Sequence, residues 1–87
     1  MDNKNLTLAD VADIIMLEFC KELGGLEHGS PYIEKAYRAA GLNLYSPTYQ
    51  QVKDAIDNLA EIEIELFDKE TSDNNLKKRL GMLDSVE

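Results

Sequence analysis

Apolar residues recur every three or four positions through most of the chain, and this spacing is what most constrains the fold. The first such run is Leu8, Val11, Ile15, Phe19 and Leu23. A repeat of this kind lines one face of an α-helix, and that face must be buried against other helices. The sequence therefore predicts an all-α protein, a small bundle of three to four helices.

Residues typical of helix ends give the first two boundaries. Thr7 precedes the first apolar run as a capping residue, and Gly24-Gly25 follows it, so a helix is expected between them. Ser30-Pro31 then combines a capping hydroxyl with a proline suited to the first helical position. A second, short helix is expected over residues 31–40, ended by Gly41.

The second half of the chain contains two further helix signals. Ser46-Pro47 repeats the start signal, and a third helix should begin at Pro47. The polar run 71–75 predicts a break followed by a new cap. A fourth helix is then expected from about Asp73 to Leu83.

Residues 61–67 fit two structures. Glu61–Leu66 alternates polar and apolar residues as a half-buried strand does, yet Leu59, Ile62 and Leu66 also continue a helical series. A strand needs a partner, and the residues that follow have helical spacing. We therefore favour a long third helix, with a winged-helix-like fold containing a short β element at 61–67 as the alternative.

The chain has 87 residues, enough for one hydrophobic core. We expect a single compact helical domain over residues 1–87, with residues 1–6 and 85–87 frayed at its ends. No segment reaches the 18 to 20 consecutive apolar residues of a membrane span, and the first residues lack the features of a secretory signal. Cys20 is the single cysteine and agrees with a reducing compartment, so a cytoplasmic location is expected.

Charge limits the kinds of partner. The sequence has 17 Asp and Glu residues against 9 Lys and Arg residues, a formal charge of −8. Nucleic-acid binders usually show a basic face, so this balance argues against a nucleic-acid partner. The basic run Lys77-Lys78-Arg79 is interpreted as the outer face of the last helix. A protein with a basic or apolar face is the expected partner.

Catalytic and metal-binding patterns are weak. His28 has Glu27 and Ser30 beside it, but neighbours in a loop do not converge as a catalytic triad requires. A calcium loop started at Asp68 fails at the positions that define it, because its twelfth residue is Arg79. We expect no enzyme activity, no cofactor and no metal site.

The residues that we expect to bind a partner combine charge with exposed apolar surface. The acids of the third helix would attract a basic partner, and tyrosines suit interfaces because their rings are apolar and their hydroxyls tolerate water. Ile64 and Phe67 fall off the main apolar face, which makes them candidates for an exposed patch or a dimer interface. The full set is Asp57, Glu61, Glu63, Ile64, Glu65, Phe67, Tyr45 and Tyr49.

These features predict a small acidic, non-catalytic adaptor or regulatory protein that acts through protein-protein interaction, with a homodimer as one arrangement. A second interpretation comes from Ile33–Gly41 and Ser46–Leu59, which resemble a helix-turn-helix, with Glu61–Leu66 as a first wing strand. The resemblance implies a DNA-binding transcription regulator. It departs from that pattern where phosphates must be met, because Lys53 is opposed by neighbouring aspartates and the wing is acidic.

Overall fold

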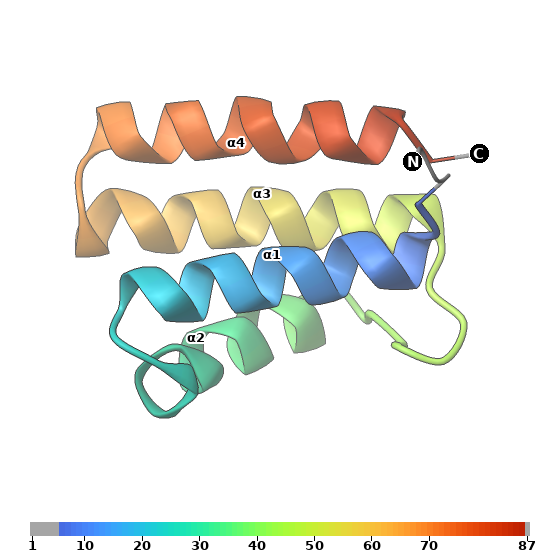
Figure 1. The fold of residues 1–87 in the computed structure, drawn as a ribbon, viewed down its shortest axis with the longest axis horizontal. Coiled ribbons are helices and arrows are strands. Elements are labelled where there is room, and N and C mark those ends of the chain that lie inside the picture. Colours follow the sequence, from blue (N-terminus) through green and yellow to red (C-terminus); the bar gives the residue numbers. More distant parts are fainter. Residues whose placement is uncertain (1–5, 87) are drawn as a thin grey trace, which may run out of the picture.

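Four α-helices make up the fold of residues 6–86, the part of the chain that the computed structural model describes. They are α1 (Leu8–Glu22), α2 (Leu26–Ala39), α3 (Tyr49–Leu66) and α4 (Lys69–Asp84), shown in Figure 1. The all-α prediction is confirmed. The β element at 61–67 is wrong, because α3 continues as a helix to Leu66 and residues 6–86 contain no strand.

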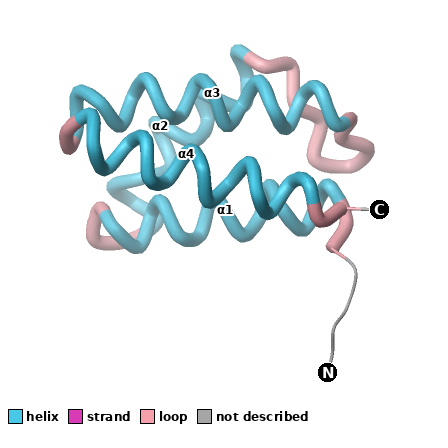
Figure 2. Tube along the Cα trace, turned by 90° about the horizontal axis from the view of Figure 1, so that it is seen from above, coloured by secondary structure: helices cyan, strands magenta, loops and turns pink. Residues whose placement is uncertain are grey.

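The helices pack around α1 and α3. In Figure 1, α4 lies along one side of α3, and α2 lies on the opposite side of the bundle. Figure 2 shows α1, α3 and α4 running alongside one another, while α2 crosses them obliquely. Both α2 and α4 contact α1 and α3. None of these helices has the length and apolar character that crossing a lipid bilayer would require.

The core lies between these helices. α1 and α3 each contribute a stripe of buried apolar side chains at the spacing that the sequence shows. The ring of Phe19 is fully buried and meets the edge of the Tyr32 ring, with 6.2 Å between ring centroids. The buried apolar set is Val11, Ala12, Ile15, Phe19, Cys20, Ile33, Ala36, Tyr37, Val52, Ala55, Ile56, Leu59, Ala60 and Leu83.

The boundaries of α1 agree with prediction. The Thr7 hydroxyl accepts a hydrogen bond from the Asp10 backbone N–H, and the Asp10 carboxylate accepts one from the Thr7 N–H. This reciprocal pair satisfies two N–H groups at the helix start. Gly24 and Gly25 follow the helix with φ of 100° and 137°, a conformation that costs little only for glycine.

The predicted start of α2 is wrong. The helix begins at Leu26, directly after Gly25, so residues 26–30 are helical and Pro31 lies inside the helix. Pro31 has no N–H to donate to the Glu27 carbonyl, but both residues are exposed, where water can satisfy that oxygen. The two glycines turn the chain tightly enough for a helix to start five residues earlier than the Ser30-Pro31 signal indicates.

The starts of α3 and α4 also differ from prediction. α3 begins after Thr48, whose hydroxyl caps the Gln51 N–H, and not at Pro47. α4 begins after Asp68, whose carboxylate accepts a 2.7 Å hydrogen bond from the Thr71 N–H. The expected break at residues 71–75 is therefore wrong. Its polar side chains are helical because several of them bond to α3 or within α4.

The expectation of frayed ends concerns residues 1–6 and 85–87. Residues 1–5 and 87 lie outside the described residues. Leu6 and Val86 are half-buried and pack against the core.

Candidate functional site

Acidic side chains gather along the outer face of α3. Asp54, Asp57, Glu61 and Glu65 recur at three- and four-residue spacing, which places them on one stripe about 16 Å long. We call these four residues the acidic stripe. Asp57 lies 3.5 Å from the Lys53 ammonium, whereas within residues 6–86 neither Glu61 nor Glu65 forms an ion pair. The two glutamates therefore present negative charge to solvent.

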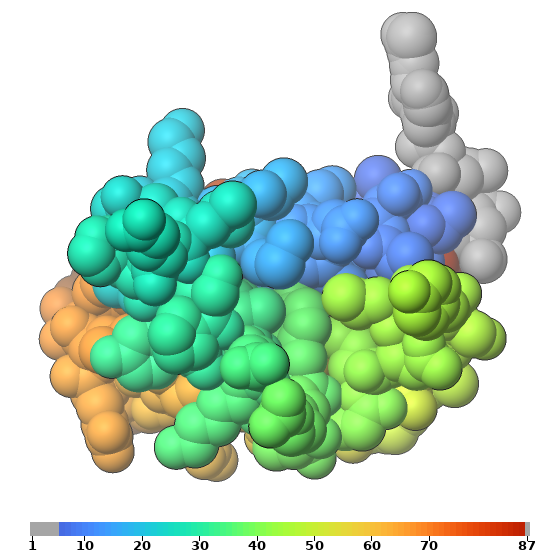
Figure 3. Space-filling view, turned by 90° about the horizontal axis from the view of Figure 1, so that it is seen from below, coloured from blue at the N-terminus to red at the C-terminus, as the bar shows by residue number. Residues whose placement is uncertain are grey.

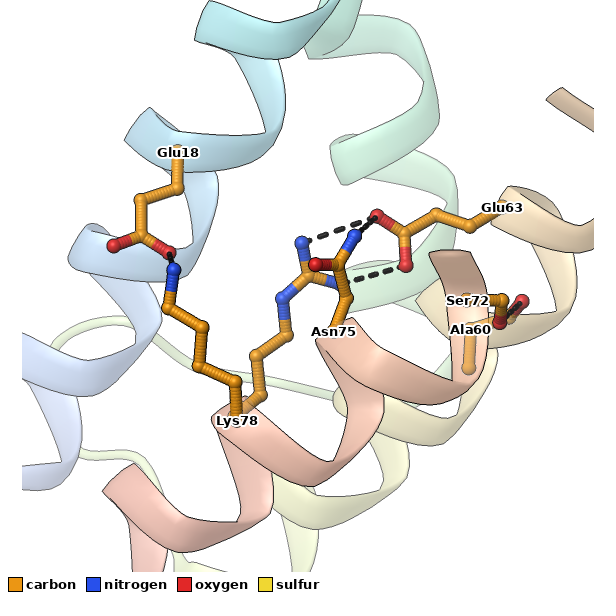
Figure 4. Close-up of polar contacts among 7 residues, drawn as sticks. Glu18, Ala60, Glu63, Ser72, Asn75 and Lys78 are labelled. Carbon is orange, nitrogen blue, oxygen red and sulfur yellow. Dashed lines mark hydrogen bonds and ion pairs between the residues drawn. The ribbon is translucent and has the colours of Figure 1, made fainter. Parts of the chain in front are cut away.

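Glu63 does not belong to this stripe, and its predicted place on the binding surface is wrong. Its side chain is 0% exposed and faces α4. The Arg79 guanidinium donates hydrogen bonds of 2.9 and 3.1 Å to the two carboxylate oxygens, and Asn75 Nδ2 donates a third at 3.1 Å (Figure 4). A carboxylate held in this way cannot meet a partner.

The basic run near the chain end is split by this arrangement. Arg79 is only 2% exposed, so its predicted place on the outer face of α4 is wrong, while Lys77 and Lys78 are exposed. Lys78 reaches across to Glu18 of α1 at 3.5 Å (Figure 4). Arg79 lies three residues after Leu76 and four before Leu83, so the helical spacing of the sequence already marks it as inward-facing.

Of the two apolar candidates, one is exposed and one is not. Ile64 is 44% exposed and borders the acidic stripe between Glu61 and Glu65. Phe67 follows the last residue of α3, is half-buried and packs against the core. Ile64 alone therefore adds apolar surface to the stripe.

The tyrosine candidates lie at the opposite end of α3 from Ile64. Tyr45 is 99% exposed in the loop between α2 and α3, and its backbone N–H bonds to the Asn43 side chain. Tyr49 opens α3, and its hydroxyl lies 3.3 Å from the Asp84 carboxylate at the end of α4. The structure brings Asp57, Glu61, Ile64 and Glu65 together but leaves these tyrosines apart from them.

A groove that the sequence interpretation missed runs beside α2. Its volume is about 620 Å³ and its apolar residues come from α1, α2 and the following loop: Met16, Ile33, Tyr37, Leu42 and Leu44. Glu27, Ser30, Pro31, Glu34 and Arg38 of α2 complete its lining, and we call this feature the α2 groove. Figure 3 shows the molecule from the α2 side, with the yellow-green loop lying beside α1 in blue.

The sequence prediction misses the groove because it starts the second helix at residue 31 and leaves residues 26–29 as a connector. With α2 starting at Leu26, Glu27, Pro31, Glu34 and Arg38 recur along one exposed edge of a single helix. The signal that could have found them is this spacing, continued backwards through the Ser30-Pro31 pair. The exposed leucine Leu44 in the following loop is a second signal.

The remaining residues considered for catalysis or metal binding lie outside these two surfaces. Burial raises the pKa of the Cys20 thiol, and hydrogen bonds from Thr71 hold the pKa of Asp68 below its usual value. His28 is exposed in the first turn of α2. Within residues 6–86, no three His, Cys, Asp or Glu side chains come together as a metal site would require.

Comparison with known proteins finds no match to this chain among protein-family models, curated proteins or solved structures.

Proposed function

We propose that this chain is a small acidic adaptor or regulatory protein that acts by binding another protein and performs no catalysis. The observation that carries the proposal is the acidic stripe on α3, where Glu61 and Glu65 expose their charge beside Ile64. A row of like charges beside an exposed apolar side chain offers a basic partner both steering and contact area.

The charge of the whole chain supports this choice of partner. A formal charge of −8 gives the protein a negative field that speeds its encounter with basic surfaces and repels acidic ones. The Lys53–Asp57 pair covers only part of the stripe, because Glu61 and Glu65 lie about one and two turns further along α3 than Asp57. Association should therefore depend on salt, since the charges that drive it are exposed.

We also propose a cytoplasmic location. The single cysteine is buried, which suits a cytoplasmic protein that needs no disulfide.

We further propose that the protein forms a homodimer through the exposed side chain of Ile64. Sedimentation equilibrium of the wild type and of Ile64→Ser tests it, and a wild type that stays monomeric at high concentration removes the dimer from the proposal.

The test of the stripe is a comparison of binding by the wild type and by a Glu61→Gln/Glu65→Gln variant. Proteins recovered from a native lysate on the wild type at low salt are identified, and the main partner is purified. Stopped-flow or surface-plasmon measurements then give its association and dissociation rates. We expect the variant to associate several-fold more slowly, with a smaller salt dependence and little change in dissociation rate.

A matched control separates the stripe from total charge. Glu22→Gln/Glu70→Gln removes the same two charges from exposed positions on α1 and α4. If this control slows association as much as the stripe variant does, net charge and not the stripe is responsible. A partner that is nucleic acid, lost on nuclease treatment, would overturn the proposal.

A further inference from the structure

The α2 groove leaves apolar surface open to solvent. Its floor is made by Ile33 and Tyr37, which are buried beneath the opening, and Met16 of α1 forms one wall. Leu44 stands at the mouth with 47% of its surface exposed. A volume of about 620 Å³ lies within the range of roughly 300 to 1,000 Å³ that protein pockets use to hold apolar groups.

The charged groups of the groove lie at its rim. The Tyr37 hydroxyl, which is the polar group of the floor, donates a 2.6 Å hydrogen bond to the Ala12 carbonyl and so is already engaged. Glu27, Glu34 and Arg38 are exposed along the edge of α2. Small-molecule pockets orient their ligand with polar groups that converge inside, whereas an apolar floor with a polar rim suits an amphipathic segment.

The length of the groove matches a short helix. Its lining follows α2 from Glu27 to Arg38, a rise of about 16 Å at 1.5 Å per residue. That distance equals about three turns of a second helix laid alongside. Leu42 and Leu44 close the end of the groove next to Arg38.

The charge of the groove's rim favours a partner segment that carries positive charge. Glu27 and Glu34 provide two carboxylates, and the single guanidinium, Arg38, is bound to Glu34 at 3.1 Å. Lysine or arginine on the flank of an incoming helix would therefore be favoured.

We propose that the α2 groove binds an amphipathic helix of about three turns from a partner protein. Apolar side chains at positions i, i+3 or i+4, and i+7 of that helix fill the groove over Ile33 and Tyr37, and its basic flank faces Glu27 and Glu34. This inference rests on the proposed function as a protein-binding adaptor and names a second contact for it. The groove and the acidic stripe lie on either side of α2, where Pro31 and Lys35 form the ridge between them.

The test uses a synthetic capped peptide of four turns, with leucines at i, i+4, i+7 and i+11 and lysines on the opposite face. It is titrated into isotope-labelled protein while backbone and methyl NMR signals are followed. We expect the shifted signals to map to Met16, Ile33, Leu42 and Leu44. A peptide with glutamate in place of every lysine is expected to bind at least tenfold more weakly.

Two leucine variants serve as a matched pair. Leu44→Ser removes the side chain at the mouth of the groove, and we expect at least a tenfold loss of peptide affinity. Leu17→Ser changes an exposed leucine of α1 that does not line the groove and is 55% exposed, so its affinity should stay within twofold of the wild type. Both positions are on the surface, and the wild-type titration with the two peptides needs neither variant to fold.

Several outcomes would overturn the groove as the helix site. These are no binding at millimolar peptide, equal binding of the acidic peptide, or equal losses for the two leucine variants. Signals that shift with protein concentration alone would assign the groove to a second copy of this chain. Shifts confined to Glu61, Ile64 and Glu65 would overturn this inference while leaving the proposed function in place. Loss of partner binding in the stripe variant without peptide shifts would have the same meaning.

Discussion

The α3–α4 interface and the α1–α2 interface are held together by different kinds of contact. Between α3 and α4, buried polar side chains meet: Glu63 with Arg79 and Asn75, and Ser72 with the Ala60 carbonyl at 2.6 Å (Figure 4). Between α1 and α2, a glycine allows close approach, because Gly29 packs directly on the Cys20 residue. A buried charged network therefore holds α3 against α4, whereas α1 and α2 are held by this close approach and by one neutral hydrogen bond, from the Tyr37 hydroxyl to the Ala12 carbonyl.

This difference explains where the candidate surfaces lie. A buried ion pair with directed hydrogen bonds holds α4 at one position along α3, and the outward face of α3 is left to solvent as the acidic stripe. α1 and α2 meet where Gly29 packs on Cys20 and again where the Tyr37 hydroxyl bonds to the Ala12 carbonyl. Beside these contacts, Met16, Ile33 and Tyr37 line the α2 groove.

The largest expected effect comes from breaking the polar interface. Arg79→Met would leave the Glu63 carboxylate buried without its charged partner, and we expect the free energy of unfolding to fall by about 3 to 5 kcal/mol. Urea denaturation followed by circular dichroism measures the loss. The exposed Lys78–Glu18 pair gives the control, because Lys78→Met should cost less than about 1 kcal/mol.

A second variant tests whether the charge pair itself is responsible. Glu63→Met/Arg79→Met replaces both partners by apolar side chains, which removes the uncompensated charge. Most of the stability lost in Arg79→Met should return. If the double variant is as unstable as the single one, packing around Arg79 and not the buried charge governs this interface.

The next largest effect is expected where α1 and α2 approach each other closely. A Cβ at position 29 would lie 2.5 Å from Cys20 Sγ and 2.7 Å from Cys20 Cα, so Gly29→Ala forces the helices apart. We expect a loss of about 1 to 3 kcal/mol in the same denaturation experiment. Adding Cys20→Ala should restore little, since the Cα atom stays in place. Full rescue by that change would show that only the thiol was crowded.

A smaller pair of effects compares one hydroxyl from each interface. Ser72 donates to the Ala60 carbonyl and Tyr37 donates to the Ala12 carbonyl, both at 2.6 Å and both buried. Ser72→Ala and Tyr37→Phe should each lower the free energy of unfolding by about 0.5 to 1.5 kcal/mol. A much larger loss for Ser72→Ala would mean that the bonds of the α3–α4 interface act as one network.

Much of the fold was predictable because local signals and tertiary packing agree there. The Thr7 cap, the glycines after α1 and the continuous helix through residues 61–66 were predicted on patterns that the structure keeps. For α2 and α4, strong local signals predict starts that are later in the sequence than the observed ones, because contacts with other helices extend both helices towards their N-termini. Ser30-Pro31 and the polar run 71–75 are both typical of helix starts, yet both lie inside helices.

The candidate site was less predictable for a physical reason. Whether a charged side chain faces solvent depends on what the opposite helix offers it, and Glu63 and Arg79 are buried because each supplies the other's partner. Glu61 and Glu65 have the same chemistry but face away from α4. The α2 groove is made by three segments that are separate in sequence, so no single run of residues could reveal it.

The smallest expected effect comes from a glycine that no neighbouring helix contacts. Gly81 lies in α4, is exposed, and has no neighbouring atom within 4 Å of where a Cβ would stand. Gly81→Ala should therefore raise the free energy of unfolding by about 0.4 to 1 kcal/mol, because alanine loses less backbone entropy in a helix. A stabilised Gly81→Ala beside a destabilised Gly29→Ala assigns the cost at position 29 to contact with α1. Equal losses at both positions would instead mean that helix ends, and not close approach, limit substitution in this bundle.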